Sequence, residues 1–259
     1  MNQEKFLTIA IAAAEAACKE ILEVYHSDNF QAELKGDNSP LTIADKRAHH
    51  AIVKLLEPTQ LPVLSEEGKD IPYEERKNWK QFWMIDPLDG TKEFIKRNGE
   101  FTVNIALLEN NKPVLGVIAV PVSGEVFYGQ AGEGAYCKNA SGVQKLNPPA
   151  FTDLQKPGIR VVASRSHLNE ETQAFINKLN QPHLVSSGSS LKFMLIAKGD
   201  ADVYPRFAPT MEWDTAAAHA IVNALDIKIY KQEGEEELSY NKPELLNPGF
   251  LVSSANKGF

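Results

Sequence analysis

The sequence predicts a mixed fold, with an α+β first half and an α/β second half, in a chain of 259 residues. Two observations lead to this prediction. Helical repeats and then short apolar runs with hairpin signals fill the first half, whereas strands and helices alternate in the second. We therefore expect a boundary near residue 150, with an N-terminal domain of residues 1–150 and a C-terminal domain of residues 151–259.

Two helices are expected at the start of the chain. Apolar residues repeat at helical spacing from about Glu4 to His26. Because Glu15 and Glu20 interrupt the apolar run, we interpret this segment as an amphipathic helix and not as a targeting segment. A second helix should begin near Thr42, which has an acid three residues further on, and should end at Pro58.

Strands dominate the rest of the first half. Two short apolar strands, residues 61–64 and 82–85, each end in acidic residues. Asn110 and Asn111 predict a hairpin turn, because Asn tolerates the left-handed backbone that such turns need. The expected antiparallel strands are residues 101–109, 114–120, 125–129 and 134–137.

Strands and helices alternate through the second half. The expected strands are residues 159–163, 183–186, 201–204, 227–230 and 250–252, and the expected helices are 169–179, 189–198 and 215–224. The acidic run 233–237 is interpreted as a solvated loop.

The composition excludes several classes of protein. A net charge of −7 argues against a dedicated nucleic-acid binder, although a phosphorylated substrate could bind where cations reverse the local sign. No apolar run approaches the roughly 20 residues of a membrane-spanning helix. Cys18 and Cys137 lie far apart, so a disulfide framework is not expected, and a reducing cytoplasm fits best.

The most informative stretch runs from Asp86 to Thr91, with the sequence Asp-Pro-Leu-Asp-Gly-Thr. Pro87 and Gly90 favour a sharp turn that aims Asp86, Asp89 and the Leu88 carbonyl at one point. Mg²⁺ prefers such oxygen ligands and is commonly held by a few carboxylates plus substrate phosphate. An ordinary Asp-rich surface turn is the alternative.

Two further acids strengthen the metal hypothesis. Glu66 follows the strand 61–64, and Asp214 lies just before an Ala-rich helix, where a simple helix cap is the alternative for Asp214 alone. Glu66, Asp86, Asp89 and Asp214 together carry four negative charges, which two Mg²⁺ ions would neutralise.

This arrangement resembles the inositol monophosphatase superfamily of Mg²⁺-dependent, lithium-sensitive phosphatases. Further motifs closely resemble its bacterial branch of 3'(2'),5'-bisphosphate nucleotidases, the CysQ type, from residue 38 to residue 250. These motifs are residues 63–67, 86–95, 98–104, 164–167, 188–193 and 204–207. The resemblance implies a layered αβαβα sandwich of the inositol monophosphatase and fructose-1,6-bisphosphatase type.

The resemblance also implies roles for individual residues. The metal ligands would be Glu66, Asp86, Asp89, Asp214 and the Leu88 carbonyl, holding two or three Mg²⁺ ions. Asp45 and Thr91 would orient and deprotonate the attacking water, which attacks phosphorus directly and in line. Without the resemblance, we would interpret Asp45 as an acid in the first turn of a helix, where the helix dipole favours a negative charge.

The implied substrate is 3'(2')-phosphoadenosine 5'-phosphate, hydrolysed to AMP and phosphate in connection with sulfate assimilation. The resemblance also gives substrate contacts to Glu66, Leu88, Asp89, Thr91 and Asp214. A second group would contact the substrate too, and the alternatives for its members are helix caps and surface polar residues. That second group is Gly90, Ser164, His167, Ser189 and Lys192.

Other functions stay open at this point. An inositol monophosphatase or a sugar-bisphosphate phosphatase would share the metal ligands and differ only in the pocket. A catalytically silent nucleotide-binding regulator is an alternative from another class, although none of the expected metal or water-activating residues is missing. A homodimer and a peripheral association with the inner membrane are also left open.

Overall fold

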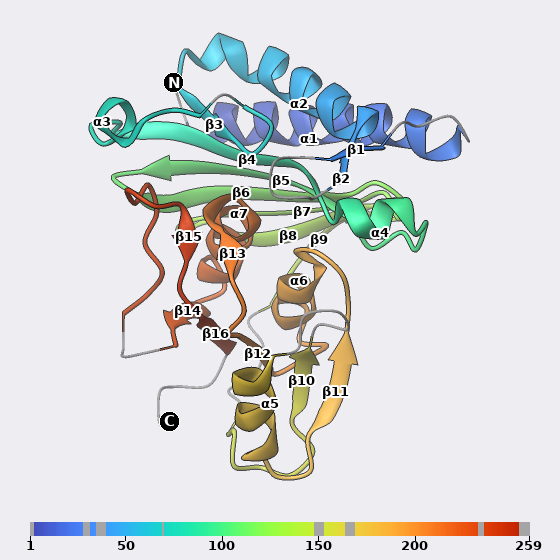
Figure 1. The fold of residues 1–259 in the computed structure, drawn as a ribbon, viewed down its shortest axis with the longest axis vertical. Helices are drawn as coiled ribbons and strands as arrows, with labels where there is room; N and C mark the ends of the chain where they lie inside the picture. The colour runs from blue at the N-terminus through green and yellow to red at the C-terminus, as the bar shows by residue number, and fades with distance from the viewer. Residues whose placement is uncertain are drawn as a thin grey trace.

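The computed structural model describes residues 3–27, 32–34, 40–68, 70–147, 153–163, 169–232 and 236–253, with the backbone alone for 32–34 and 40–42. Figure 1 shows five layers: helices, a sheet, helices, a second sheet and a last helix. The expected layered α+β architecture is therefore confirmed.

The outer helical layer is an antiparallel pair, α1 (Gln3–His26) and α2 (Ile43–Leu56). The short β1 (Ala32–Leu34) and β2 (Pro40–Thr42) pair antiparallel between them. The buried stripe of α1 is mostly alanine, which lets the helix lie close to its neighbours. A 3-10 turn that contains Pro58, η1 (Glu57–Thr59), follows α2 as expected.

The first sheet has seven strands in the order β3-β4-β5-β6-β7-β8-β9, antiparallel except for the β3–β4 pair. The strands are β3 (Val63–Ser65), β4 (Gln81–Asp89), β5 (Thr102–Glu109), β6 (Lys112–Val120), β7 (Glu125–Gln130), β8 (Gly134–Asn139) and β9 (Gly142–Lys145). The expected hairpin turn forms at Asn110 and Asn111, whose φ angles are +50° and +62°.

Alternation along β4 explains why the first sheet is covered on both faces. Trp83 and Ile85 pack with α1 and α2, whereas Phe82 and Met84 belong to the core on the other face. The prediction that this strand stops at Ile85 is wrong. The strand continues to Asp89 with a shift of register after Asp86, because Pro87 has no N–H to give to the ladder.

The second sheet has five strands in the order β11-β10-β12-β16-β14. They are β10 (Arg160–Ala163), β11 (His183–Ser186), β12 (Val203–Arg206), β14 (Lys228–Lys231) and β16 (Phe250–Ser253). The strands β10, β11 and β12 run parallel, while β16 pairs antiparallel with β12 and β14.

Two helices, α6 (Leu191–Ala197) and α7 (Glu212–Asn223), lie between the sheets, and α5 (Glu170–Asn177) covers the far face of the second sheet (Figure 1). Gly116 and Gly129 let α7 approach the first sheet, since a Cβ at Gly116 would lie 2.1 Å from the carbonyl oxygen of Ala217. Val162 faces this middle layer, whereas Val161 and Ala163 face α5.

Several short elements were not anticipated from the sequence: α3 (Tyr73–Arg76), α4 (Thr91–Ile95) and the β13 (Thr210–Met211) and β15 (Leu246–Asn247) pair, besides β1, β2 and β9. The boundary near residue 150 stays a prediction, and residues 148–152 lie outside the described residues. No helix in the described ranges is long and apolar enough to cross a membrane.

Candidate active site

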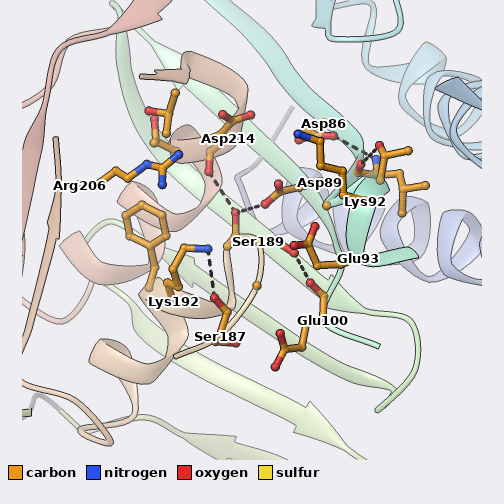
Figure 2. Close-up of a pocket in the computed structure, with 18 of the residues that line it drawn as sticks. Asp86, Asp89, Lys92, Glu93, Glu100, Ser187, Ser189, Lys192, Arg206 and Asp214 are labelled. Carbon is orange, nitrogen blue, oxygen red and sulfur yellow. Dashed lines mark hydrogen bonds between the residues drawn. The ribbon is translucent and has the colours of Figure 1, made fainter. Parts of the chain in front are cut away.

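A cavity of about 490 Å³ opens where the two halves of the chain meet. Its walls come from the end of β4, the start of α4, the loop before α6 and the first turn of α7. Figure 2 shows acids of β4 and α7 on one side and the side chains of Lys192 and Arg206 on another. One cavity therefore combines a concentration of carboxylates with basic groups.

The irregular end of β4 shapes the acidic wall. The Leu88 N–H donates to Oδ1 of Asp86 at 3.1 Å, which folds the chain back at Pro87. Gly90 follows with a φ of +93°, and a Cβ there would lie 2.8 Å from Oγ of Ser189. A glycine is therefore needed at this position both for its backbone conformation and for the close approach of the second half of the chain.

Asp86 is 1% exposed and lies at the centre of the acids. Burial raises the pKa of its carboxyl group well above the ordinary value, and the charges of Glu66, Asp89, Asp214 and Asp45 raise it further. The five acids therefore act on one another electrostatically. A cation placed among them would stabilise their charged forms.

Asp214 lies in the first turn of α7, so its expected position just before the helix is wrong by one turn. The Met211 N–H donates to its Oδ2 at 2.9 Å, which fixes the side chain across the helix start. Burial and then the charge of Asp89 raise the pKa of the Asp214 carboxyl well above its ordinary value.

Asp89 is held by hydroxyl groups. Ser190 Oγ lies 3.0 Å from Oδ2 of Asp89 and also 3.0 Å from the carbonyl oxygen of Asp214. Thr102 Oγ1 lies 3.4 Å from the same Oδ2. Residues from both halves of the chain thus position this carboxylate.

The remaining members of the predicted catalytic set lie at different depths. Glu66 and Thr91 line the cavity, and the Thr91 hydroxyl lies 3.4 Å from the Leu88 carbonyl oxygen to which it donates. Asp45, in the first turn of α2, is fully buried and is not part of the cavity wall. Its charge nevertheless acts on Asp86 from the side of the helical layer.

Lys192 and Arg206 form the basic wall. Lys192 is 8% exposed, and burial lowers the pKa of its ammonium group to about 8. Its Nζ lies 3.4 Å from the carbonyl oxygen of Ser187, a weak hydrogen bond that leaves donors for a ligand. Nε of Arg206 is buried without a hydrogen-bond partner among the described residues. Both groups suit a phosphate.

The structure brings together most of the predicted site residues, but Ser164 and His167 lie outside the described residues. The Ser189 hydroxyl donates to the Glu100 carbonyl oxygen at 2.5 Å, with a φ of +42° at Ser189. The sequence interpretation assigned no role to Ser190 or Arg206. Ser190 lies in the motif 188–193 and Arg206 in the motif 204–207, and membership of these motifs was the one sequence signal that could have marked them as site residues.

The carboxylates fit divalent cations by their chemistry, because Mg²⁺ prefers oxygen ligands and a cation would offset the mutual repulsion that helps to raise the pKa values of Asp86 and Asp214. No three His, Cys, Asp or Glu side chains in the described part of the chain already surround one point as a closed site. Each ion would therefore take few carboxylates and fill its coordination with carbonyl, water or phosphate oxygens.

Comparisons with known proteins agree with this chemistry. A family model described as the inositol monophosphatase family matches residues 2–257. The chain is 46% identical over 246 residues to the 3'(2'),5'-bisphosphate nucleotidase CysQ of Escherichia coli K12, covering 93% of this chain and 96% of that protein. The nucleotidase CysQ of Haemophilus influenzae is 37% identical over 235 residues, which cover 89% of this chain and 86% of that protein.

Solved structures give the same relationship. CysQ from Bacteroides thetaiotaomicron, described as a bacterial member of the inositol monophosphatase family, is 47% identical with a TM-score of 0.87, and 98% of each chain is covered. An IMPase/NADP phosphatase in complex with NADP and Ca²⁺ shares the fold at 18% identity and a TM-score of 0.81, over 98% of this chain and 92% of that one.

Proposed function

Because the chain belongs to the inositol monophosphatase family, we propose that it is a 3'(2'),5'-bisphosphate nucleotidase that converts 3'-phosphoadenosine 5'-phosphate to AMP and phosphate. One structural observation supports this activity most directly. A single cavity presents four acids suited to metal ions opposite Lys192 and Arg206, which suit a second phosphate group. A substrate with two phosphate groups matches both walls.

Members of this family are metal-dependent, and we assign Mg²⁺ to the acidic wall of this cavity. Its ligands would be Glu66, Asp86, Asp89, Asp214 and the Leu88 carbonyl. When bound, the cation lowers the pKa of water and neutralises charge on the phosphate. The proposal includes two or three ions.

Thr91 and Asp45 handle the proton of the attacking water in this proposal. The Thr91 hydroxyl lines the cavity and, among the described residues, makes a single long hydrogen bond to the Leu88 carbonyl oxygen, so it is available to orient a water molecule. Asp45 is fully buried in the first turn of α2, and in this proposal its carboxylate takes the proton of the water that Thr91 orients. The activated water attacks the phosphorus atom directly, so no covalent phosphoenzyme forms.

Lys192 and Arg206 bind the remainder of the nucleotide. Lys192 carries a positive charge below a pH of about 8, so at neutral pH it attracts a phosphate oxygen. We also assign Gly90, Ser189, Ser164 and His167 to this side of the pocket, as the motifs imply.

The test is a panel of substrates at fixed Mg²⁺ concentration, with phosphate release as the readout. 3'-Phosphoadenosine 5'-phosphate should have the highest kcat/KM, above 3'-AMP, inositol 1-phosphate and fructose 1,6-bisphosphate. A preference for inositol 1-phosphate would contradict the substrate assignment, and undiminished phosphate release in excess chelator would contradict the metal-dependent mechanism.

Lithium gives a second readout of the same mechanism. Li⁺ is small and hard like Mg²⁺ but carries one charge, so it should occupy a metal position without activating water as well. We expect inhibition by LiCl but not by NaCl or KCl at matched ionic strength, because screening would affect all three salts alike. Superimposable curves for LiCl and NaCl would remove this expectation.

A further inference from the structure

Beneath the cavity, a buried chain of polar side chains joins the two halves of the molecule at Asp89. It consists of Thr102 and Asn104 on β5 and Ser190 just before α6, which are 0%, 1% and 1% exposed. These three side chains are here called the polar relay. All three are polar, and buried polar groups are costly unless they are paired. Their arrangement therefore points to a role at the site.

The hydrogen-bond directions within the polar relay follow from its one amide. Asn104 Nδ2 donates to Ser190 Oγ at 3.0 Å, while Asn104 Oδ1 lies 3.2 Å from Thr102 Oγ1 and can only accept. Since Ser190 Oγ accepts from Asn104, its own single hydrogen is free to be donated onward. Two acceptors lie at 3.0 Å, Oδ2 of Asp89 and the carbonyl oxygen of Asp214.

The charged acceptor is favoured, because hydrogen bonds to ionised groups are shorter and roughly twice as strong as neutral ones. Thr102 Oγ1 has one hydrogen and two acceptors, Asn104 Oδ1 at 3.2 Å and the same Oδ2 of Asp89 at 3.4 Å, so Ser190 gives Asp89 the shorter hydrogen bond. Within the described residues, Oδ1 of Asp89 accepts no hydrogen bond. The polar relay thus fixes one oxygen of the carboxylate and leaves the other for a cation.

We propose that Ser190, oriented by Asn104, is a positioning residue that sets the affinity of the Asp89 site for Mg²⁺. The same hydroxyl lies beside the backbone of Asp214, so one side chain aligns acids that come from β4 and from α7. This inference rests on the proposed function, because it presumes that Mg²⁺ binds at the acidic wall.

The experiment is calorimetric titration of the metal-free protein with MgCl₂, for the wild type and for Ser190→Ala. Outer partners of metal ligands typically contribute 10- to 100-fold in affinity, so the Kd of Ser190→Ala should rise at least tenfold. At saturating Mg²⁺ the KM for 3'-phosphoadenosine 5'-phosphate should stay within twofold, because excess cation restores the site.

Ser253→Ala is the matched control. Ser253 is also buried, 6% exposed, and its hydroxyl donates to the Asp202 carbonyl oxygen at 3.3 Å, away from the cavity. Its Kd for Mg²⁺ should equal that of the wild type. A second variant, Asn104→Ala, keeps the Ser190 hydroxyl but removes the group that orients it, so its Kd should rise less than that of Ser190→Ala.

Two results would overturn the inference. One is a folded Ser190→Ala protein with a Kd for Mg²⁺ within twofold of the wild type. The other is an unchanged Kd with a raised KM at saturating Mg²⁺, which would assign the hydroxyl to the substrate instead. Absence of Mg²⁺ binding to the wild-type protein would be a different failure, because it would remove the proposed function itself.

Discussion

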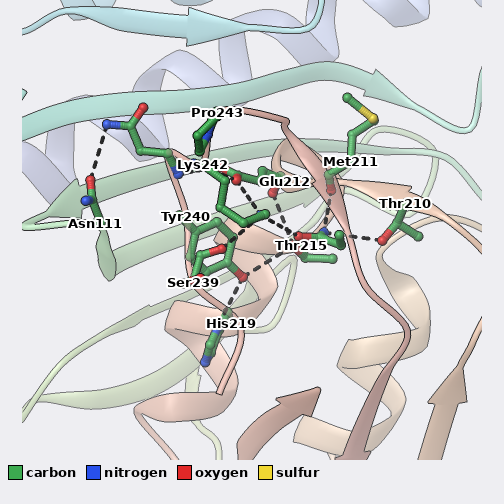
Figure 3. A network of polar contacts seen from close by, with 12 residues as sticks. Asn111, Thr210, Met211, Glu212, Thr215, His219, Ser239, Tyr240, Lys242 and Pro243 are labelled. Atoms are coloured by element: carbon green, nitrogen blue, oxygen red, sulfur yellow. Dashed lines mark hydrogen bonds and ion pairs between the residues drawn. The ribbon is translucent and has the colours of Figure 1, made fainter. Parts of the chain in front are cut away.

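Two buried acids in this protein have opposite surroundings. Glu212, at the start of α7, is fully buried and accepts hydrogen bonds from the N–H groups of Asn241 and Lys242 and from Nζ of Lys242 (Figure 3). Asp86 is equally buried, but in the described part of the chain every charged group that acts on its pKa is another acid.

The difference separates structural charge from functional charge. Burial raises the pKa of Glu212, and the charge of Lys242 offsets part of that rise, so the protein itself supplies a counter-charge. The network around Glu212 also ties Asn241 to Arg76, and Asn247 to Met211 and to Thr215 in the first turn of α7. At Asp86 the neighbouring charges are acids, so a cation bound among them would supply the counter-charge that Lys242 supplies to Glu212.

The largest expected effect comes from Asp89→Asn. Removal of one ligand charge should lower Mg²⁺-dependent phosphate release about 1000-fold, since metal stabilisation of the transition state amounts to several kcal/mol. The metal-free variant should also unfold at a higher temperature than the wild type, because one like charge beside Asp86 and Asp214 is gone. A fully active Asp89→Asn protein would contradict the conclusion that the acids around Asp86 bind a cation, unlike Glu212.

The next effect concerns the water-activating pair. Thr91→Ala and Asp45→Asn should each lower kcat about 100-fold with little change in KM, because general-base assistance typically contributes 10²- to 10⁴-fold. The double variant should be little slower than either single one. Losses that multiply in the double-mutant cycle would show that the two residues do not share one proton path.

Removal of a partner of Glu212 should lower the free energy of unfolding, whereas the substitutions at the acidic wall lower activity. Lys242→Met leaves the buried Glu212 carboxylate with its backbone donors alone, which should cost about 2 kcal/mol, or about thirtyfold in the unfolding equilibrium. Urea unfolding measures the change. The control is Lys198→Met, which removes a partner of the exposed ion pair with Asp200 and should change stability little. Equal losses would refute the contrast.

The smallest expected effect is a pH dependence. Because burial lowers the pKa of Lys192 to about 8, its charge is present at pH 7 and is lost as the pH rises through 8. KM for 3'-phosphoadenosine 5'-phosphate should therefore rise about tenfold between pH 7 and pH 9 in the wild type. Lys192→Met should have a high KM without this slope, whereas Lys198→Met should retain the slope of the wild type.

The sequence was sufficient for local features of the fold and site. Strand alternation and the Asn110-Asn111 turn depend on neighbours in the chain, and both form as such signals predict. The bulge after Asp86 was missed because a strand that continues through a proline is exceptional.

What the sequence could not indicate is contact across long separations. Ser190 meets Asp89 from 101 residues away, and Arg76 meets Asn241 from 165 residues away. No local pattern marks a serine whose hydroxyl will reach a distant carboxylate, so only the folded chain distinguishes Ser190 from an ordinary helix cap. Likewise, the depth of Asp45 depends on how α2 packs on β4.

The position of α7 between the sheets has a consequence for synthesis of the chain. The face of the first sheet that carries Phe82, Met84 and Ile118 is completed by a helix encoded roughly a hundred residues later. At roughly 5–20 residues per second, that face waits on the order of 5–20 s on the ribosome for its cover. The cavity of the candidate active site is therefore assembled late, and until α7 emerges the uncovered face of the nascent sheet exposes apolar side chains that favour aggregation.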